Sequence, residues 1–92
     1  MNRYVFHEDP GHGWLEVDRH ELARFVDLSE VSYFSYQNDF SYQNGGKVYL
    51  EEDCDAPLFL KALKDSGVEY ELVEKVYPTH DAPLRNFDHF RP

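Results

Sequence analysis

Hydrophobic and polar residues alternate along several short stretches of this chain, and such alternation is typical of β-strands that bury one face. Five stretches show the pattern, which predicts strands at residues 3–8, 12–17, 31–37, 47–51 and 68–77. The sequence Asp9-Pro10-Gly11 separates the first two, and this composition favours a tight turn. We therefore expect the first two strands to pair as a hairpin.

Two stretches show helical spacing instead. Apolar residues at positions 22, 25 and 26 predict a helix over residues 18–27, with Asp18 and Glu21 forming a variant of the capping box. A second helix is predicted over residues 56–66, where Asp53 or Asp55 caps the N-terminus and Gly67 caps the C-terminus. We expect both helices to lay one apolar face on the sheet.

The strongest local signal is the sequence Asn44-Gly45-Gly46, because Asn-Gly supplies the positive φ angles of two-residue hairpin turns. It predicts that the third and fourth strands pair, with Val48 and Leu50 inward and Tyr49 outward. The pentapeptide Phe-Ser-Tyr-Gln-Asn occurs twice before this turn, at residues 34–38 and 40–44. The copies are offset by an even number of positions, so they would present the same faces if both were strand.

The predicted order is β-β-α-β-β-α-β. Hairpin connections favour an α+β domain, with a small antiparallel or mixed five-stranded sheet and two helices on one face. This domain would comprise residues 1–77. Residues 78–92 contain three prolines and no clear period, which predicts an irregular C-terminal tail docked on the domain by Leu84, Phe87 and Phe90.

Composition adds an aromatic core and a strong negative charge. A chain of 92 residues, 41% of them hydrophobic, predicts one domain with one core, and seven Tyr, seven Phe and one Trp would fill much of it. Eighteen acidic and nine basic residues give a formal net charge of −9. This charge disfavours binding to nucleic acid and to anionic membranes. It favours a basic protein partner, or it serves solubility alone.

Cys54 is the only cysteine, so an internal disulfide is impossible and a disulfide-stapled secreted scaffold is excluded. No stretch approaches the roughly 18 apolar residues of a membrane span. The N-terminal residues lack the apolar segment of a secretion signal. We therefore expect a cytoplasmic protein.

Four carboxylates crowd into five positions around Cys54, namely Glu51, Glu52, Asp53 and Asp55. Helix capping explains part of this cluster, because the helix dipole favours each acid at the N-terminus by about 0.3–1 kcal/mol. One acid would satisfy that need, so the excess indicates a surface for a cationic partner or a divalent ion. An EF-hand calcium loop is not supported, because its spacing is missing.

Residue types that bind metals also gather near the first turn, namely His7, Glu8, Asp9 and His12. No second pair at zinc-ligand spacing accompanies them, so a polar turn explains the group as well. Cys54 with a distant histidine could act as a nucleophile, but the neighbouring acids disfavour its thiolate. We assign no catalytic residue, metal or cofactor, and a metal-dependent enzyme using His7 and His12 stays a third hypothesis.

Aromatic residues concentrate around the predicted third and fourth strands, namely Tyr33, Phe34, Tyr36, Phe40, Tyr42 and Tyr49. Alternation turns part of the set outward, and exposed Tyr with Asn, Ser and Gly is typical of adaptable recognition surfaces. The alternative is an aromatic sheet face covered by the C-terminal tail. The sequence favours neither.

The blocks YVFHEDPGHGWLEV, SYQ, KVYLEEDCDAPLFLKA and LRNFDHF resemble a family of small uncharacterised proteins of phages and other bacterial mobile elements. Its members have similar sequences at GHGWLEV and YLEEDCDA, and the likeness covers most of the chain. The segment 38–44 is longer than the corresponding segment of the family pattern. The family has no assigned activity, so no residue role is carried over. The resemblance implies a context in which small acidic proteins often inhibit host nucleic-acid-binding or defence proteins, as anti-CRISPR proteins do.

The sequence therefore favours a small acidic, non-enzymatic binding protein that inhibits a basic host protein, one that handles nucleic acid. The alternative is a structural or accessory protein of a mobile element that forms a homodimer through its aromatic hairpin. For the first hypothesis the contact residues would be the acidic cluster, a second acidic row and three tyrosine anchors, namely Glu51, Glu52, Asp53, Asp55, Glu69, Glu71, Glu74, Tyr36, Tyr42 and Tyr49.

Overall fold

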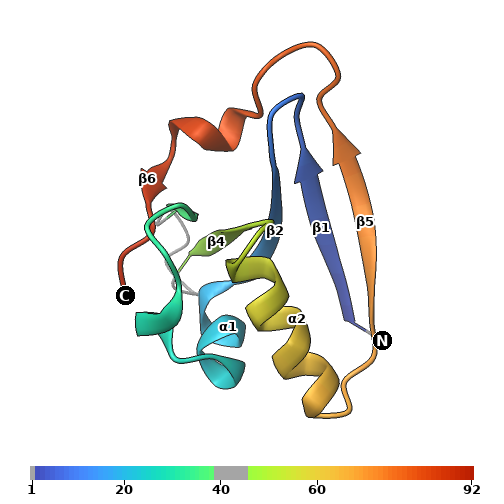
Figure 1. The fold of residues 1–92 in the computed structure, drawn as a ribbon, viewed down its shortest axis with the longest axis vertical. Coiled ribbons are helices and arrows are strands. Elements are labelled where there is room, and N and C mark those ends of the chain that lie inside the picture. The colour runs from blue at the N-terminus through green and yellow to red at the C-terminus, as the bar shows by residue number, and fades with distance from the viewer. Residues whose placement is uncertain (1, 39–45) are drawn as a thin grey trace.

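The computed structural model describes residues 2–38 and 46–92. Within them, one mixed sheet of six strands has the order β5-β1-β2-β4-β3-β6, and two α-helices lie on one of its faces (Figure 1). The strands are β1 (Asn2–Glu8), β2 (Gly13–Asp18), β3 (Tyr36–Asn38), β4 (Lys47–Glu51), β5 (Tyr70–Val76) and β6 (Asp88–His89). The helices are α1 (Arg19–Phe25) and α2 (Asp55–Asp65), with 3₁₀ turns η1 (Leu28–Glu30) and η2 (Pro83–Asn86).

The predicted α+β class is confirmed, and the sheet has one strand more than predicted because β6 forms inside the C-terminal tail. The boundary proposed at residue 77 stays a prediction. In residues 2–38 and 46–92, no helix combines the length and the apolar composition that crossing a bilayer requires.

The first two strands pair as the predicted hairpin, with Phe6 opposite Leu15. The Asp9 side chain shapes the turn, since its Oδ1 accepts from the backbone N–H groups of Gly11 and His12, each at 2.9 Å. A short side chain that bonds to backbone two and three residues ahead is a usual turn-forming device. The hairpin is therefore encoded locally.

The last long strand lies at an edge of the sheet. Helix α2 carries the chain from β4 past β2 and β1, so β5 runs beside β1 and parallel to it, from Asn2 opposite Tyr70 to Glu8 opposite Val76. The chain turns from α2 toward β5 at Gly67, which has a φ of +74° and is the predicted glycine cap of the helix.

The main core lies between the sheet and the two helices. Tyr4 contacts Phe59 edge to face at 5.4 Å, and its hydroxyl donates to Glu21 at 2.6 Å. Burial, with a further effect of Glu21, raises the pKa of Tyr4 to about 12. The largest fully buried side chains of this core are Phe59, Leu15, Leu22, Leu50 and Leu63.

The predicted capping box of α1 is wrong. Asp18 occupies the N-cap position but makes no cap hydrogen bond, because its carboxylate pairs with Lys47 at 2.6 Å on the neighbouring strand β4. Glu21 accepts from Tyr4 in place of the backbone. Both acids are used between elements that only the folded chain brings together.

A second hydrophobic cluster covers the opposite face, so the prediction of a single core is wrong. Trp14 and Tyr49 on this face pack with Ala82 and Leu84, and Phe87 lies against Tyr49 with 5.4 Å between ring centroids. Figure 1 shows the C-terminal segment passing from the end of β5 to the far edge of the sheet. The outward-facing side of β4 is therefore covered, and Tyr49 is only 7% exposed.

Residues 31–35 do not form the predicted strand. The Asp55 carboxylate accepts from the backbone N–H of Ser32 at 3.0 Å and from the Ser32 and Ser35 hydroxyls at 2.6 Å each. Hydrogen bonds of this kind compete with a strand ladder. The chain turns here, and Phe34 is left 72% exposed.

Strand β3 begins only at Tyr36. It pairs antiparallel with β4, with Tyr36 opposite Tyr49, so the predicted pairing of these segments is confirmed. The Asn44-Gly45 turn and the second copy of the pentapeptide lie outside the described residues.

Candidate functional site

A groove of about 400 Å³ opens where the start of β2, the end of β4 and the C-terminal segment meet. Its walls come from four separate parts of the chain, and the described residues contribute aromatic, acidic and imidazole groups to it. The aromatic and imidazole wall consists of Trp14, Phe34, Tyr36, His12 and His89. The acidic rim consists of Glu51, Glu52 and Asp53.

The aromatic wall is a stack of rings fixed by hydrogen bonding. His89 lies between Tyr33 and Tyr36, with ring centroids 4.0 and 4.9 Å away, and its Nδ1 donates to the Tyr33 carbonyl at 2.8 Å. Tyr36 meets Trp14 edge to face at 6.0 Å. Phe34 stands at the open side. The wall therefore combines a buried ring, Trp14, with a ring that is exposed to solvent, Phe34.

The four clustered carboxylates divide into two that hold the fold and two that have no Lys or Arg partner among the described residues. Glu51 caps α2, accepting from the backbone N–H groups of Asp53 and Cys54 at 2.9 and 2.5 Å and of Asp55 at 3.1 Å. Burial acts to raise the pKa of Glu51, but these three donors outweigh it and the pKa is lowered. Asp55 is buried and accepts hydrogen bonds from Ser32 and Ser35, as described above. Glu52 and Asp53 are left.

Neither Glu52 nor Asp53 is paired with a Lys or Arg in the part of the chain that the structure describes. Glu52 Oε1 lies 3.9 Å from His12 Nδ1, and both side chains are partly exposed to solvent. Asp53 is exposed. These two carboxylates can therefore accept from a cation that enters the groove.

One cation already forms part of the groove wall. Arg85 lies over the Trp14 ring, 4.8 Å from its centroid, and donates to Asp9 at 2.7 and 2.9 Å. Asp9 is fully buried and also accepts from Ala82 N–H at 2.9 Å. The Arg85 guanidinium, with the backbone donors, holds the pKa of Asp9 far below its usual range despite burial. The buried carboxylate of Asp9 therefore neutralises the charge of Arg85.

The sequence placed Asp9 among possible metal ligands and did not predict its ion pair with Arg85. The residues Asp9-Pro10-Gly11 do signal a turn in which the aspartate accepts from the backbone ahead. Its bond to Arg85 joins residues far apart in sequence, and no local pattern reports that contact. The prediction that Trp14 lies in the core is confirmed, and the structure adds that this residue also lines the groove.

The predicted contact residues are only partly brought together. Glu51, Glu52, Asp53 and Tyr36 line the groove, whereas Asp55 is buried behind it. Tyr49 is buried under Phe87, and Tyr42 lies outside the described residues. The second acidic row, Glu69, Glu71 and Glu74, is on or beside β5 and does not line the groove.

The histidines expected for a metal-dependent enzyme do not converge. His7 is buried between Glu16, 2.9 Å from its Nε2, and Tyr77, 3.2 Å from its Nδ1. His12 is exposed at the groove. Within residues 2–38 and 46–92, no group of three or more His, Cys, Asp or Glu side chains is arranged to hold a metal ion.

Cys54 lies on the groove but is poorly suited to nucleophilic attack. The carboxylate of Glu51 raises the pKa of the exposed Cys54 thiol, and some loss of hydration, Asp55 and Asp53 act in the same direction. At neutral pH the thiol form therefore dominates, and the thiolate is the reactive form.

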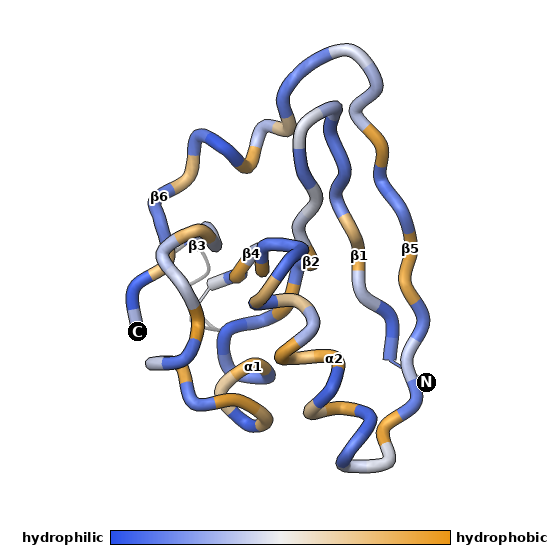
Figure 2. Tube along the Cα trace, in the orientation of Figure 1, coloured by the Kyte–Doolittle hydropathy of each residue, from blue (hydrophilic) through white to orange (hydrophobic). Residues whose placement is uncertain are grey.

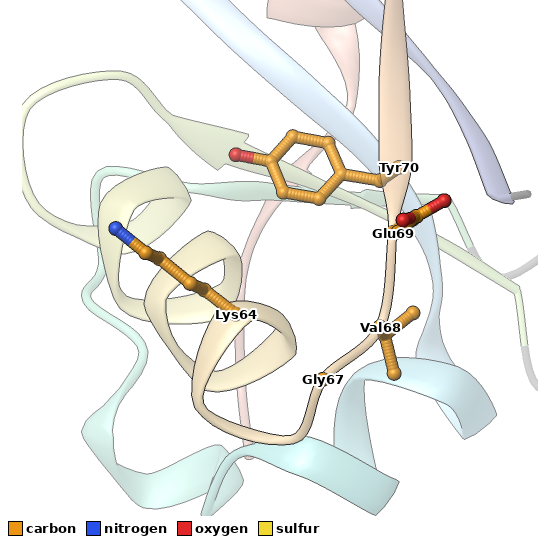
Figure 3. A pocket seen from close by; sticks show the side chains of 5 residues that line it. All are labelled: Lys64, Gly67, Val68, Glu69 and Tyr70. Carbon is orange, nitrogen blue, oxygen red and sulfur yellow. The ribbon is translucent and has the colours of Figure 1, made fainter.

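A second hollow, of about 430 Å³, lies beside the end of α2 and the start of β5 (Figure 3). Figure 3 shows Tyr70 and Lys64 extending over the helix end while Glu69 points the other way. Its lining is mainly apolar, and the two charged groups do not converge. We therefore take the groove as the candidate functional site.

Comparisons of the chain with protein-family models, with curated proteins and with solved structures gave no match.

Proposed function

We propose that this protein is a small, non-enzymatic binding protein that receives a cationic side chain of a basic partner in the groove. The observation that carries the proposal is the pairing of two free carboxylates, Glu52 and Asp53, with a wall of aromatic rings. A guanidinium or ammonium group is attracted both by carboxylates and by ring faces, most strongly where water is partly excluded. The formal net charge of −9 would steer such a partner toward the protein.

The partner we propose is a host protein with a basic, nucleic-acid-handling surface, and the protein acts as its inhibitor in the host cytoplasm in the manner of an anti-CRISPR protein. A surface that binds phosphates is rich in Lys and Arg. Carboxylates held on a rigid wall can occupy such a surface in place of phosphate. The resemblance to mobile-element proteins and the acidic composition support this partner class. The homo-oligomeric alternative through the aromatic hairpin stays a prediction.

The test uses an arginine-rich peptide as probe and measures its dissociation constant by calorimetry at several salt concentrations. The variant Glu52→Gln with Asp53→Asn removes the free carboxylates and leaves Glu51 and Asp55 to hold the fold. We expect binding at least about tenfold weaker, equivalent to about 1.4 kcal/mol, with a shallower salt dependence.

The matched control is Glu69→Gln with Glu74→Gln, which removes the same charge from exposed positions away from the groove. It should bind nearly as tightly as the unchanged protein. Equal weakening by both double variants would mean that the peptide responds to overall charge, and the groove would then not be the binding site.

A further inference from the structure

Strand β5 forms a long open edge of the sheet. Among the described residues it pairs only with β1, and Leu72, Val73 and Val76 are 42, 47 and 54% exposed. Figure 1 shows β5 at one margin of the molecule, and Figure 2 shows hydrophobic residues along it. The opposite edge, β6, has only two residues. A seven-residue edge strand with exposed apolar side chains is a template for adding another strand.

The hydrogen bonds at the two ends of β5 show which of its backbone groups face outward. Asn2 N–H donates to the Glu69 carbonyl at 3.3 Å, and Tyr77 N–H donates to the Glu8 carbonyl at 2.8 Å. In a parallel pair, alternate residues direct both backbone groups to the same neighbour. The odd-numbered residues of β5 therefore bond to β1. The outward N–H and C=O groups belong to residues 70, 72, 74 and 76.

We propose that two copies of this chain associate through β5, as antiparallel strands related by a two-fold axis at Val73. In this register Leu72 lies opposite Glu74 of the second copy, and Tyr70 lies opposite Val76. All four are residues with outward backbone groups, so each opposed pair exchanges two hydrogen bonds. The two six-stranded sheets then join into one continuous sheet.

Charge complementarity selects this register. Glu71 of each copy lies opposite Lys75 of the other, so the interface contains two opposite-charge pairs, and such cross-strand pairs are favourable. A two-fold axis at Glu74 would place two carboxylates directly opposite each other. An axis at Leu72 would leave residues 75 and 76 without partners in the opposed strand. Charged residues usually protect an edge strand from pairing, but here Glu71 and Lys75 face opposite charges, and Glu74 lies opposite Leu72.

The apolar side chains fit the same arrangement. The two copies of Val73 meet at the axis, on the sheet face that carries His7. On the helix face, Val76 of the second copy lies opposite Tyr70, which lines the hollow in Figure 3. Val73 and Val76 are thereby covered by Val73 and Tyr70 of the second copy, whereas Leu72 lies opposite Glu74. None of the residues that line the groove belongs to β5, so a dimer presents two free grooves.

The test measures mass in solution by light scattering over a range of concentrations, with a chain mass of 10.9 kDa as reference. We expect the unchanged protein to reach twice this mass. Glu71→Lys makes positions 71 and 75 both basic, and Lys75→Glu makes them both acidic, so each variant alone should be monomeric. An equimolar mixture of the two variants should regain the doubled mass, because each charge then meets its opposite.

Matched controls separate this effect from a change in net charge. Glu30→Lys and Lys61→Glu alter the charge equally at exposed positions on η1 and α2, and both should dimerise. Because Glu71 also pairs with Arg3, folding of each variant is checked by circular dichroism. If a charge variant fails to fold, Glu74→Pro tests the same edge, since it removes an outward N–H without touching the bonds to β1.

The proposal is overturned if the unchanged protein keeps the mass of one chain at all concentrations. It is also overturned if the mixed variants stay monomeric while the controls dimerise, or if Glu74→Pro dimerises as well as the unchanged protein. Peptide binding at the groove is measured separately, so the failure of either proposal leaves the other standing.

Discussion

Replacing Asp9 by alanine tests the contact that fastens the C-terminal segment to the sheet. The buried carboxylate accepts five hydrogen bonds of 2.7 to 2.9 Å, three from backbone N–H groups of Gly11, His12 and Ala82 and two from Arg85. Removing one partner of a buried ion pair costs about 3–5 kcal/mol. The Arg85 side chain is 28% exposed, so water can solvate part of its charge. We therefore expect a loss near the lower limit, about 3 kcal/mol.

Urea unfolding measures this loss. A domain of 92 residues has a total stability of about 5–14 kcal/mol, so Asp9→Ala should shift the midpoint strongly. Trp14 is the only tryptophan and contacts Arg85, so its fluorescence reports on the docked segment, while far-UV circular dichroism reports on the helices. The control Asp81→Ala removes an exposed acid from the same segment and should change stability by less than about 0.5 kcal/mol. A loss below about 1 kcal/mol for Asp9→Ala would refute the reasoning.

The same carboxylate predicts a pH dependence. Because the pKa of Asp9 is lowered in the folded state, the unfolded chain binds the proton more readily at acidic pH. Its stabilisation is fully present above the unfolded pKa of about 3.9 and is lost as the pH falls through the folded pKa. The stability difference between the unchanged protein and Asp9→Ala should therefore shrink below about pH 4. A difference that stays constant down to pH 2 would contradict the assignment.

Three further substitutions test local features by the same unfolding assay. Gly67→Ala should cost about 1 kcal/mol from the positive φ alone, because no atom lies within 4 Å of the added methyl group; no loss would mean that the cap is absent. Gly13→Ala should cost about 1–3 kcal/mol, because its Cβ would meet the Phe6 ring at 2.4 Å, and an unchanged midpoint would contradict that packing. Asp55→Ala should cost about 2–3 kcal/mol, because the buried Ser35 hydroxyl still accepts from Glu51 N–H but has no acceptor for its own proton, whereas Glu52→Ala, its exposed-rim control, should cost less than about 0.5 kcal/mol.

Short-range sequence patterns predict much of the fold. The β1–β2 hairpin follows from alternation and from Asp9-Pro10-Gly11, and α2 follows from its apolar stripe and from the glycine cap at Gly67. These signals work because the residues that interact are within a few positions of one another. The region 31–35 misled the alternation rule, because the buried carboxylate of Asp55 recruits the serines there into a turn.

The position of the candidate site could be predicted from the sequence, but the role of each acidic residue in it could not. Glu51, Glu52 and Asp53 stood out as an excess of acids, and they do line one groove with Tyr36. The prediction that Asp53 or Asp55 caps α2 is wrong, because Glu51 accepts from the backbone N–H groups at the start of the helix and Asp55 accepts from Ser32 and Ser35. Only the positions of these acids relative to the backbone N–H groups decide which of them caps the helix.

The sequence by itself determined the α+β class, the acidic surface charge and the residues available for the groove, since these depend on composition and short-range periodicity. The tertiary structure alone decided that β5 lies beside β1 at an edge of the described sheet and that the C-terminal segment covers the second face of the sheet. It also decided that Arg85 meets Asp9. These contacts join distant residues whose pairing depends on which surfaces remain to be buried once the local elements have formed, and no short-range pattern records that choice.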